Sequence, residues 1–262
     1  MFDFIYGIPL LITGIALVVI FGSLAAAGLF FVRRRILPRI RFNEEDAVFS
    51  STILLSIMVI YGLMMALVAI SVWERYSDTE RVVSQEATEL AVLYRDVTRY
   101  PLPARTQLQE ALKKYVEYVI HESWPEQRKG IVPRGGIERI DLFERTLATF
   151  EPATEGQKTL HAETLRTYDE MIEARRLRMD AGEAALPGIM WVMMFIGAAM
   201  GLTGSFFFRV SDPRLQLIHV VLFAAFIAMV IFMVLAFDRP FQGGVRIGSE
   251  SFELIYNQLM KR

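Results

Sequence analysis

Charged residues stand directly after two of the long apolar segments of this 262-residue chain. Glu74 and Arg75 follow the second apolar segment, and Asp238 and Arg239 follow the fourth. Carboxylates and guanidinium groups brought to one membrane face can form a structural ion-pair cluster, whereas four separately solvated charges would contribute little. We favour a cluster of these four residues that holds the two halves of the membrane part together. Trp73, just before the first pair, is also typical of an aromatic ring at headgroup level.

Other polar side chains allow two interpretations each. The second apolar segment begins with hydroxyl residues that could face a pore or could bond backbone carbonyls of the preceding turn. These residues are Ser50, Ser51, Thr52 and Ser56. His219, near one end of the fourth segment, is typical of an interfacial histidine, and a functional titration is the alternative. Arg175 and Arg176 lie in the run 174–178, which predicts a solvated helix face, with lipid phosphates or small anions as alternative partners.

The composition and the motifs exclude several classes of function. The chain has no cysteine, and its three histidines are not paired at ligand spacing, so we expect no metal site. It lacks the motifs of serine hydrolases, phosphate-binding loops, zinc proteases and haem attachment, so we expect neither an enzyme nor a cofactor. The net charge of −1 gives no general attraction to nucleic acid.

Four uncharged segments position these residues and define the class of protein. Hydrophobic residues make up 53% of the sequence, and the mean hydropathy is +0.36. Each uncharged segment exceeds the roughly 20 residues that a helix needs to cross the hydrocarbon core. The sequence therefore predicts an all-α integral membrane protein. Its four transmembrane helices are expected over about 5–32, 50–73, 186–208 and 215–237. In the third, Gly197, Gly201 and Gly204 predict close helix packing.

The spans form two hairpins, residues 1–73 and 184–238, which flank a polar helical domain over 74–183. Residues 239–262 form a C-terminal tail. Apolar residues recur in the polar domain at steps of three and four, and Pro101, Pro103, Pro152 and the glycine-rich stretch 130–136 separate the helices. The first of these stripes follows the second span without a breaker, which predicts one long helix. The stripes are Val83, Ala87, Leu90, Tyr94 and Val97; Leu108, Leu112, Tyr115 and Val119; Ile140, Phe143, Leu147 and Phe150; and Leu165, Tyr168 and Ile172. We expect a small helical bundle, with contacts between subunits as the alternative use of the stripes.

The loops between the spans indicate an orientation. Five arginines lie between positions 33 and 41, and Arg209 and Arg214 flank the second loop. The positive-inside rule places loops 33–46 and 209–214 in the cytoplasm of a cell (inner) membrane protein, with the polar domain on the opposite side. Arg239, Arg246, Lys261 and Arg262 in the tail partly disagree with this orientation.

Several ordered sequence elements resemble the bacterial bestrophin-like domain family, a membrane family of unknown function. The elements extend over nearly the whole chain. They are Trp73-Glu74-Arg75-Tyr76; Gln85 to Leu90 with Glu86; Leu93-Tyr94-Arg95; Tyr115 with Glu122-Ser123-Trp124-Pro125; Ala174 to Arg178; Leu186-Pro187 with Trp191; and Asp238-Arg239-Pro240-Phe241 with Gly243. Phe237 departs from the family pattern, which more often has leucine there.

The resemblance implies a layout and, by analogy of fold, a function. Bestrophins are pentameric anion channels with four spans and a helical domain between spans two and three, which lies in the cytoplasm. The bestrophin channel motif itself is not evident here, and we favour the opposite sidedness that the loop charges indicate. The first functional hypothesis is an oligomeric channel or pore for a small anion, in contact with membrane lipid. The alternative is a non-conducting scaffold or sensor whose polar domain binds a partner or ligand.

Overall fold

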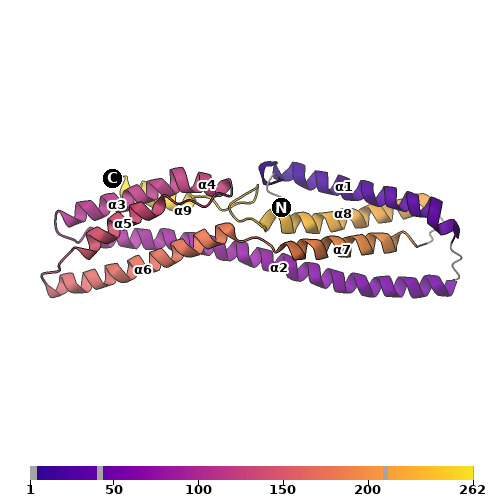
Figure 1. The fold of residues 1–262 in the computed structure, drawn as a ribbon, viewed down its shortest axis with the longest axis horizontal. Coiled ribbons are helices and arrows are strands. Elements are labelled where there is room, and N and C mark those ends of the chain that lie inside the picture. Colours follow the sequence, from indigo (N-terminus) through magenta and orange to yellow (C-terminus); the bar gives the residue numbers. More distant parts are fainter. Residues whose placement is uncertain (1–4, 40–43, 209–211, 262) are drawn as a thin grey trace. The chain divides into compact units, whose positions relative to one another are not determined.

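Within residues 5–39, 44–208 and 212–261, which the computed structural model describes, every regular element is a helix (Figure 1). The α-helices are α1 Leu10–Phe31, α2 Glu44–Val97, α3 Ala104–Tyr118, α4 Trp124–Arg128, α5 Gly136–Ala148, α6 Glu155–Glu183, α7 Gly188–Ser205, α8 Pro213–Phe237 and α9 Glu250–Ile255. Shorter helical turns are η1 Ile5–Gly7, η2 Val32–Ile36, η3 Leu37–Arg39, η4 Val119–Ser123 and η5 Tyr256–Met260.

The chain forms two compact units. The transmembrane unit consists of residues 1–74, 185–238 and 243–245, and the polar unit consists of residues 75–184, 239–242 and 246–262. The predicted long helix is confirmed, because α2 has 54 residues without a break. At 1.5 Å per residue it is about 80 Å long. Most of the C-terminal tail belongs to the polar unit.

Four helices of the chain are long and apolar enough to cross a membrane. They lie within Leu10–Arg39, Val48–Val97, Gly188–Ser205 and Pro213–Phe237, close to the predicted spans. The principal helix pair in the transmembrane unit is α1 with α8 (Figure 1). The first and last spans are therefore neighbours, although they are the most distant in sequence.

The second span packs against the third through the predicted glycines. Cβ atoms built at these glycines would lie 2.2 Å from the Tyr61 ring for Gly197, 2.6 Å from Met58 for Gly201 and 2.4 Å from Leu54 for Gly204. The Tyr61 hydroxyl donates to the carbonyl of Met194 at 3.1 Å. Side chains of α2 therefore lie directly against the α7 backbone at these three glycines, which confirms the prediction of close packing at the level of side chain on backbone.

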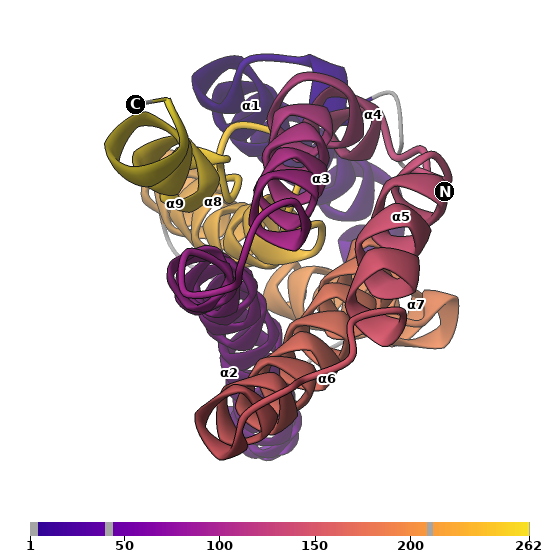
Figure 2. The same cartoon turned by 90° about the vertical axis from the view of Figure 1, so that its left-hand side faces the viewer.

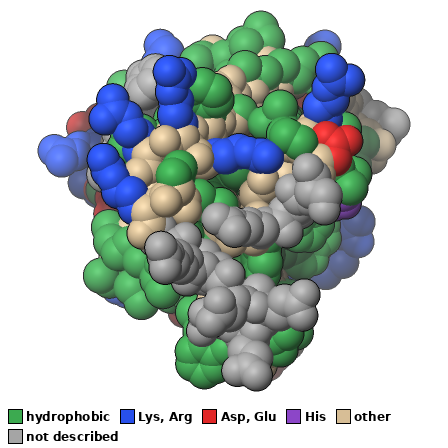
Figure 3. Space-filling view, turned by 90° about the vertical axis from the view of Figure 1, so that its right-hand side faces the viewer, with side chains coloured by type: hydrophobic (Ala, Val, Ile, Leu, Met, Phe, Trp, Pro, Cys, Tyr) green, Lys and Arg blue, Asp and Glu red, His purple; other side chains and the backbone are tan. Residues whose placement is uncertain are grey.

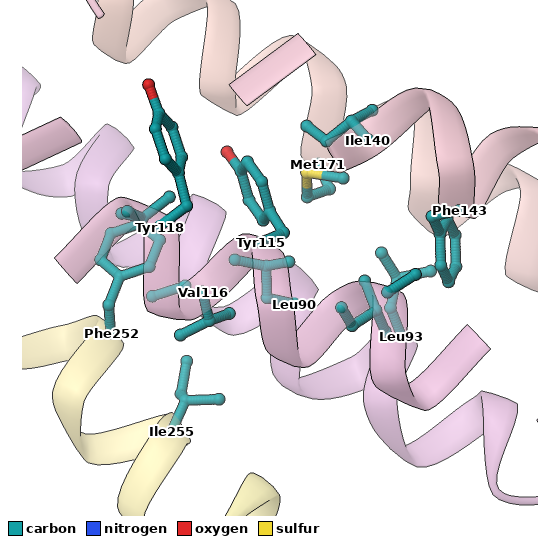
Figure 4. Packing of buried hydrophobic residues seen from close by; sticks show 14 of the residues in the cluster. Leu90, Leu93, Tyr115, Val116, Tyr118, Ile140, Phe143, Met171, Phe252 and Ile255 are labelled. Carbon is teal, nitrogen blue, oxygen red and sulfur yellow. The ribbon is translucent and has the colours of Figure 1, made fainter. Parts of the chain in front are cut away.

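The polar unit has a core of its own, formed by one apolar face from each of its helices. Figure 2 views the ribbon from the end where α3, α5 and α6 of this unit lie. Leu90, Leu108, Val119 and Leu147 have no exposed surface. Figure 4 shows how side chains of α2, α3, α5, α6 and α9 meet in this core. The stripes thus pack within the chain as expected, except that Leu165 is 38% exposed.

Local sequence signals explain where α6 and α8 begin. Thr154 caps α6 by accepting from the Gln157 amide at 3.2 Å, and Gln157 in turn accepts from the Ala153 amide at 2.8 Å. Asp212 caps α8 by accepting from the Arg214 amide at 2.8 Å, ahead of Pro213 in the first turn. Such side chains satisfy amides that have no partner within the helix.

Candidate functional site

The centre of the polar unit holds an ion pair between Glu86 of α2 and Arg178 of α6. Arg178 Nε donates to Glu86 Oε2 at 2.6 Å, and Nη2 donates to Oε1 at 3.1 Å. The Glu86 side chain is 0% exposed and the Arg178 side chain is 1% exposed. This two-pronged geometry is the strongest form of a carboxylate–guanidinium contact.

Neighbouring side chains satisfy the remaining polar atoms of the pair. The Tyr115 hydroxyl donates to Glu86 Oε1 at 2.7 Å, and Arg178 Nη1 donates to Gln127 Oε1 at 2.9 Å. The guanidinium carbon lies 5.1 Å from the ring centre of Trp124 and 5.7 Å from that of Phe252. Charges taken out of water are stable only with such complete compensation.

The helical period places both charges in the core. Glu86 lies three residues after Val83 and four before Leu90, so it belongs to the buried face of α2. Arg178 follows Met171 by seven residues on the buried face of α6. The expectation of a solvated face for residues 174–178 is therefore wrong for Arg178.

Electrostatics keep the Tyr115 phenol and the Arg178 guanidinium of this network protonated at ordinary pH. Burial raises the pKa of the Tyr115 hydroxyl, and the Glu86 carboxylate raises it further, so the phenol stays protonated. Burial alone would lower the pKa of Arg178, but the Glu86 carboxylate outweighs that effect and the net direction is upward. A group with a raised pKa contributes stability that is complete below its ordinary pKa and is lost as the pH rises from that value toward the raised one, so mildly alkaline conditions should leave this contact intact.

The arrangement can hold helices together, and it offers no reactive group. The Glu86 carboxylate is covered by Arg178 and Tyr115. Among the described residues, no group of three or more potential ligands could hold a metal ion. The network therefore joins α2, α3, α4 and α6 at a single point and fixes their register.

Asp238 forms a second buried polar site, in the transmembrane unit. It is 4% exposed at the end of α8. Its Oδ1 accepts from the backbone amide of Leu186 at 2.6 Å, and its Oδ2 accepts from the Tyr6 hydroxyl at 3.1 Å. One carboxylate thus ties the end of the fourth span to the start of the third and to the turn before the first.

We expect Asp238→Ala to lower the free energy of unfolding by about 1–3 kcal/mol, because the buried Leu186 amide would lose its acceptor. Asp238→Asn keeps an acceptor oxygen and should cost clearly less. Thermal unfolding of the purified full chain, followed by circular dichroism, compares the two variants. Equal losses from both would contradict the role of the Leu186 contact.

The predicted charge cluster has its members in both compact units. Glu74 and Asp238 belong to the transmembrane unit, whereas Arg75 and Arg239 belong to the polar unit. Glu74 is exposed, and Arg75 and Arg239 are half-buried. The Arg75 Nη1 atom is buried without a hydrogen-bond partner among the described residues. The contacts of Asp238 with Leu186 and Tyr6 were not anticipated, and the four-residue cluster stays a prediction.

Aromatic residues of the family elements pack within the transmembrane unit. Trp73 meets Phe237 edge to face, with ring centres 5.2 Å apart, so the second and fourth spans touch where they end. Phe237, the departure from the family pattern, thus supplies a ring for this contact. Pro187 is exposed and precedes the first residue of α7, and Trp191 is buried one turn later.

The element that contains Pro240 and Phe241 lies in the polar unit beside Trp124. Phe241 is 2% exposed, and its ring meets that of Trp124 edge to face at 5.7 Å. Pro240 is buried, and its carbonyl accepts from the Ile247 amide at 2.8 Å. The Trp124 indole donates to the Ile247 carbonyl at 3.3 Å. The tail is thereby held against the core.

The remaining candidate residues are not members of the two hydrogen-bonded networks, although the Arg175 charge is close enough to Tyr115 to oppose the rise in the pKa of its hydroxyl. Tyr94 and Arg175 are half-buried, whereas Arg95 and Arg176 are exposed. The Ser51 and Thr52 hydroxyls donate to the Val48 carbonyl, and the Ser56 hydroxyl donates to that of Thr52. Ser50 is half-buried. His219 is exposed, with Nδ1 2.8 Å from the Leu215 carbonyl.

Basic side chains gather at one end of the transmembrane unit, the face that Figure 3 turns to the viewer. The described ones are Arg33, Arg34 and Arg35 of η2, Arg39 of η3 and Arg214 of α8. Arg33 donates to Gln216 Oε1 at 3.1 Å, which joins the first loop to α8. Arg41 and Arg209 of the predicted loops lie outside the described residues.

Four apolar helices and a separate polar core define the chain as a helical multi-pass membrane protein. The sequence model of the Bestrophin-like domain family matches residues 20–252. The chain therefore belongs to the Bestrophin-like family, as its sequence elements predicted. None of the curated proteins and none of the solved structures matches it.

Proposed function

We propose that the protein is an oligomeric pore for small anions in the inner membrane of a bacterium. Its four spans form two hairpins around an extramembrane helical domain, as in bestrophins. The family membership supports this function, and the gathering of arginines at one end of the transmembrane unit carries it. Clustered positive charge raises the local concentration of anions at a pore mouth.

The same arginines support an orientation. Loops 33–46 and 209–214 face the cytoplasm, and the polar unit lies on the opposite side. A reporter enzyme fused after residue 262 tests this, since the tail shares the polar unit's side. Activity of the reporter on the cytoplasmic side would contradict the orientation and leave the pore proposal standing.

Conductance is the direct test of the function. We expect the purified protein, reconstituted in planar bilayers, to give currents whose reversal potential follows the chloride gradient. Arg34→Gln together with Arg35→Gln should lower the permeability of chloride relative to potassium, because both side chains are exposed at the charged end. Arg105→Gln, an exposed arginine of α3, is the control. Absence of current over a range of salt concentrations and pH would overturn the proposal.

A non-conducting scaffold or sensor is the second candidate function. One observation favours it: the hydroxyls of Ser51, Thr52 and Ser56 donate to carbonyls of their own helix, so their donors are already occupied. Oligomeric state in mild detergent, measured by light scattering, separates the two functions. A closed ring supports a central pore, and a monomer supports the scaffold.

A further inference from the structure

A cleft of about 520 Å³ opens in the polar unit between residues 120–128 and the C-terminal residues 248–261. This volume lies within the range of small-ligand sites, roughly 300–1,000 Å³. One wall consists of η4 and α4, and the other consists of α9, η5 and the residues just before them. Both walls belong to a single compact unit.

The second wall is acidic on balance, whereas the first carries a guanidinium and an imidazole. His121 and Arg128, two helical turns apart, line the first wall, and Glu250, Glu253 and Lys261 line the second, so that two carboxylates stand beside one ammonium group. All five side chains are exposed. No ion pair within the described residues joins the two walls. The charged groups of the two walls therefore line the same cleft without a direct ion pair between them.

Contacts of Trp124 hold the two walls of the cleft together without a ligand. Trp124 lines the cleft, donates to the Ile247 carbonyl and packs against Phe252 with ring centres 5.3 Å apart. The guanidinium of Arg178 lies 5.1 Å from the Trp124 ring centre and fixes it to the buried ion pair. A preformed site loses less conformational entropy when a ligand binds.

We propose that this cleft binds a small zwitterion of the amino-acid type. Arg128 and His121 receive its carboxylate, while Glu250 and Glu253 receive its ammonium group through charge-assisted hydrogen bonds. A ligand with only a negative charge would leave Glu250 and Glu253 with a single cation, Lys261, on their wall, and an amine would leave Arg128 unpaired. Only a ligand with both charges pairs with both walls. The proposal does not depend on whether the protein conducts.

Titration calorimetry with the twenty common L-amino acids, one at a time, tests this on the purified full chain. We expect at least one to bind. Its analogue without the amino group and its analogue without the carboxylate should each bind at least about tenfold more weakly, since one charge-assisted contact is worth roughly 1.5–3 kcal/mol. For leucine the analogues are 4-methylpentanoate and 3-methylbutylamine. Binding by none of the twenty, or equal binding by either analogue, overturns the proposal.

Variants of the walls locate the site. Arg128→Gln, and Glu250→Gln together with Glu253→Gln, should each weaken binding by about tenfold or more. Their positions are exposed, so the fold should persist, and an unchanged melting temperature verifies this. Arg105→Gln, which removes a positive charge outside the cleft, should bind like the unaltered protein. Full affinity in both wall variants would place the binding elsewhere and contradict the assignment.

Discussion

Replacing Arg178 with methionine should lower the free energy of unfolding of the protein by about 3–5 kcal/mol, because the Glu86 carboxylate would stay buried without its countercharge. Methionine fills much of the arginine's volume, so the loss reports the charge rather than a cavity. For a chain of this size the melting temperature should fall by roughly 2–4 °C for each kcal/mol. Thermal unfolding of the purified full chain, followed by circular dichroism, measures the change.

Two further variants separate the charge effect from general damage to α6. Arg176→Met changes a side chain that is 83% exposed, two residues away, and should shift stability by no more than about 0.5 kcal/mol. Combining Arg178→Met with Glu86→Leu removes both charges and should recover part of the loss. A double variant less stable than Arg178→Met would show that the unpaired carboxylate does not cause the effect.

Gly197→Ala should destabilise the transmembrane unit by about 1–3 kcal/mol, the usual cost of forcing extra volume into a packed interface. A Cβ there would lie 2.2 Å from Tyr61, whose hydroxyl is already fixed to the Met194 carbonyl. The ring cannot move aside without losing this hydrogen bond. The melting temperature in detergent should fall accordingly.

Gly62→Ala is the matched control, because Gly62 is also inside a transmembrane helix but, apart from its own stretch of helix, no atom of the described residues lies within 4 Å of its Cβ position. Alanine is favoured over glycine within helices by about 1 kcal/mol, so this variant should be neutral or slightly stabilising. The opposite ranking of the two alanine variants would show that α7 and α2 do not pack through Gly197.

Much of the fold could be predicted because its signals are local. The length of an uncharged segment fixes a span, and recurrence at three and four residues fixes the buried face of a helix. Glu44–Val97 is one helix because no proline or glycine follows Gly62 before it ends. Which helices pack together is not local. The pairing of α1 with α8 depends on complementary apolar surfaces that loop lengths do not reveal.

The buried sites were predicted only in part. Glu86 and Asp238 were recognised as elements of a family pattern, yet their partners were not. Arg178 stands in a run of arginines that reads as a solvated surface, although its place seven residues after Met171 was a usable signal. The partner of Asp238 at Leu186 is a backbone amide. Every residue except proline has one, so the sequence does not indicate which amide will bind the carboxylate. Gln127 likewise shows nothing that distinguishes it from surface glutamines.

The separation of Glu86 and Arg178 along the chain affects how the polar unit can fold during translation. The two residues are 92 positions apart. At 5–20 residues per second, about 5–20 s pass between the synthesis of the carboxylate and that of its guanidinium partner. During that interval the nascent α2 carries a charge that cannot yet enter a core. The contacts of Trp124 with Ile247 and Phe252 form only after residue 252 has been synthesised. Interrupted chains should therefore be left with an open polar unit and be marked for proteolysis.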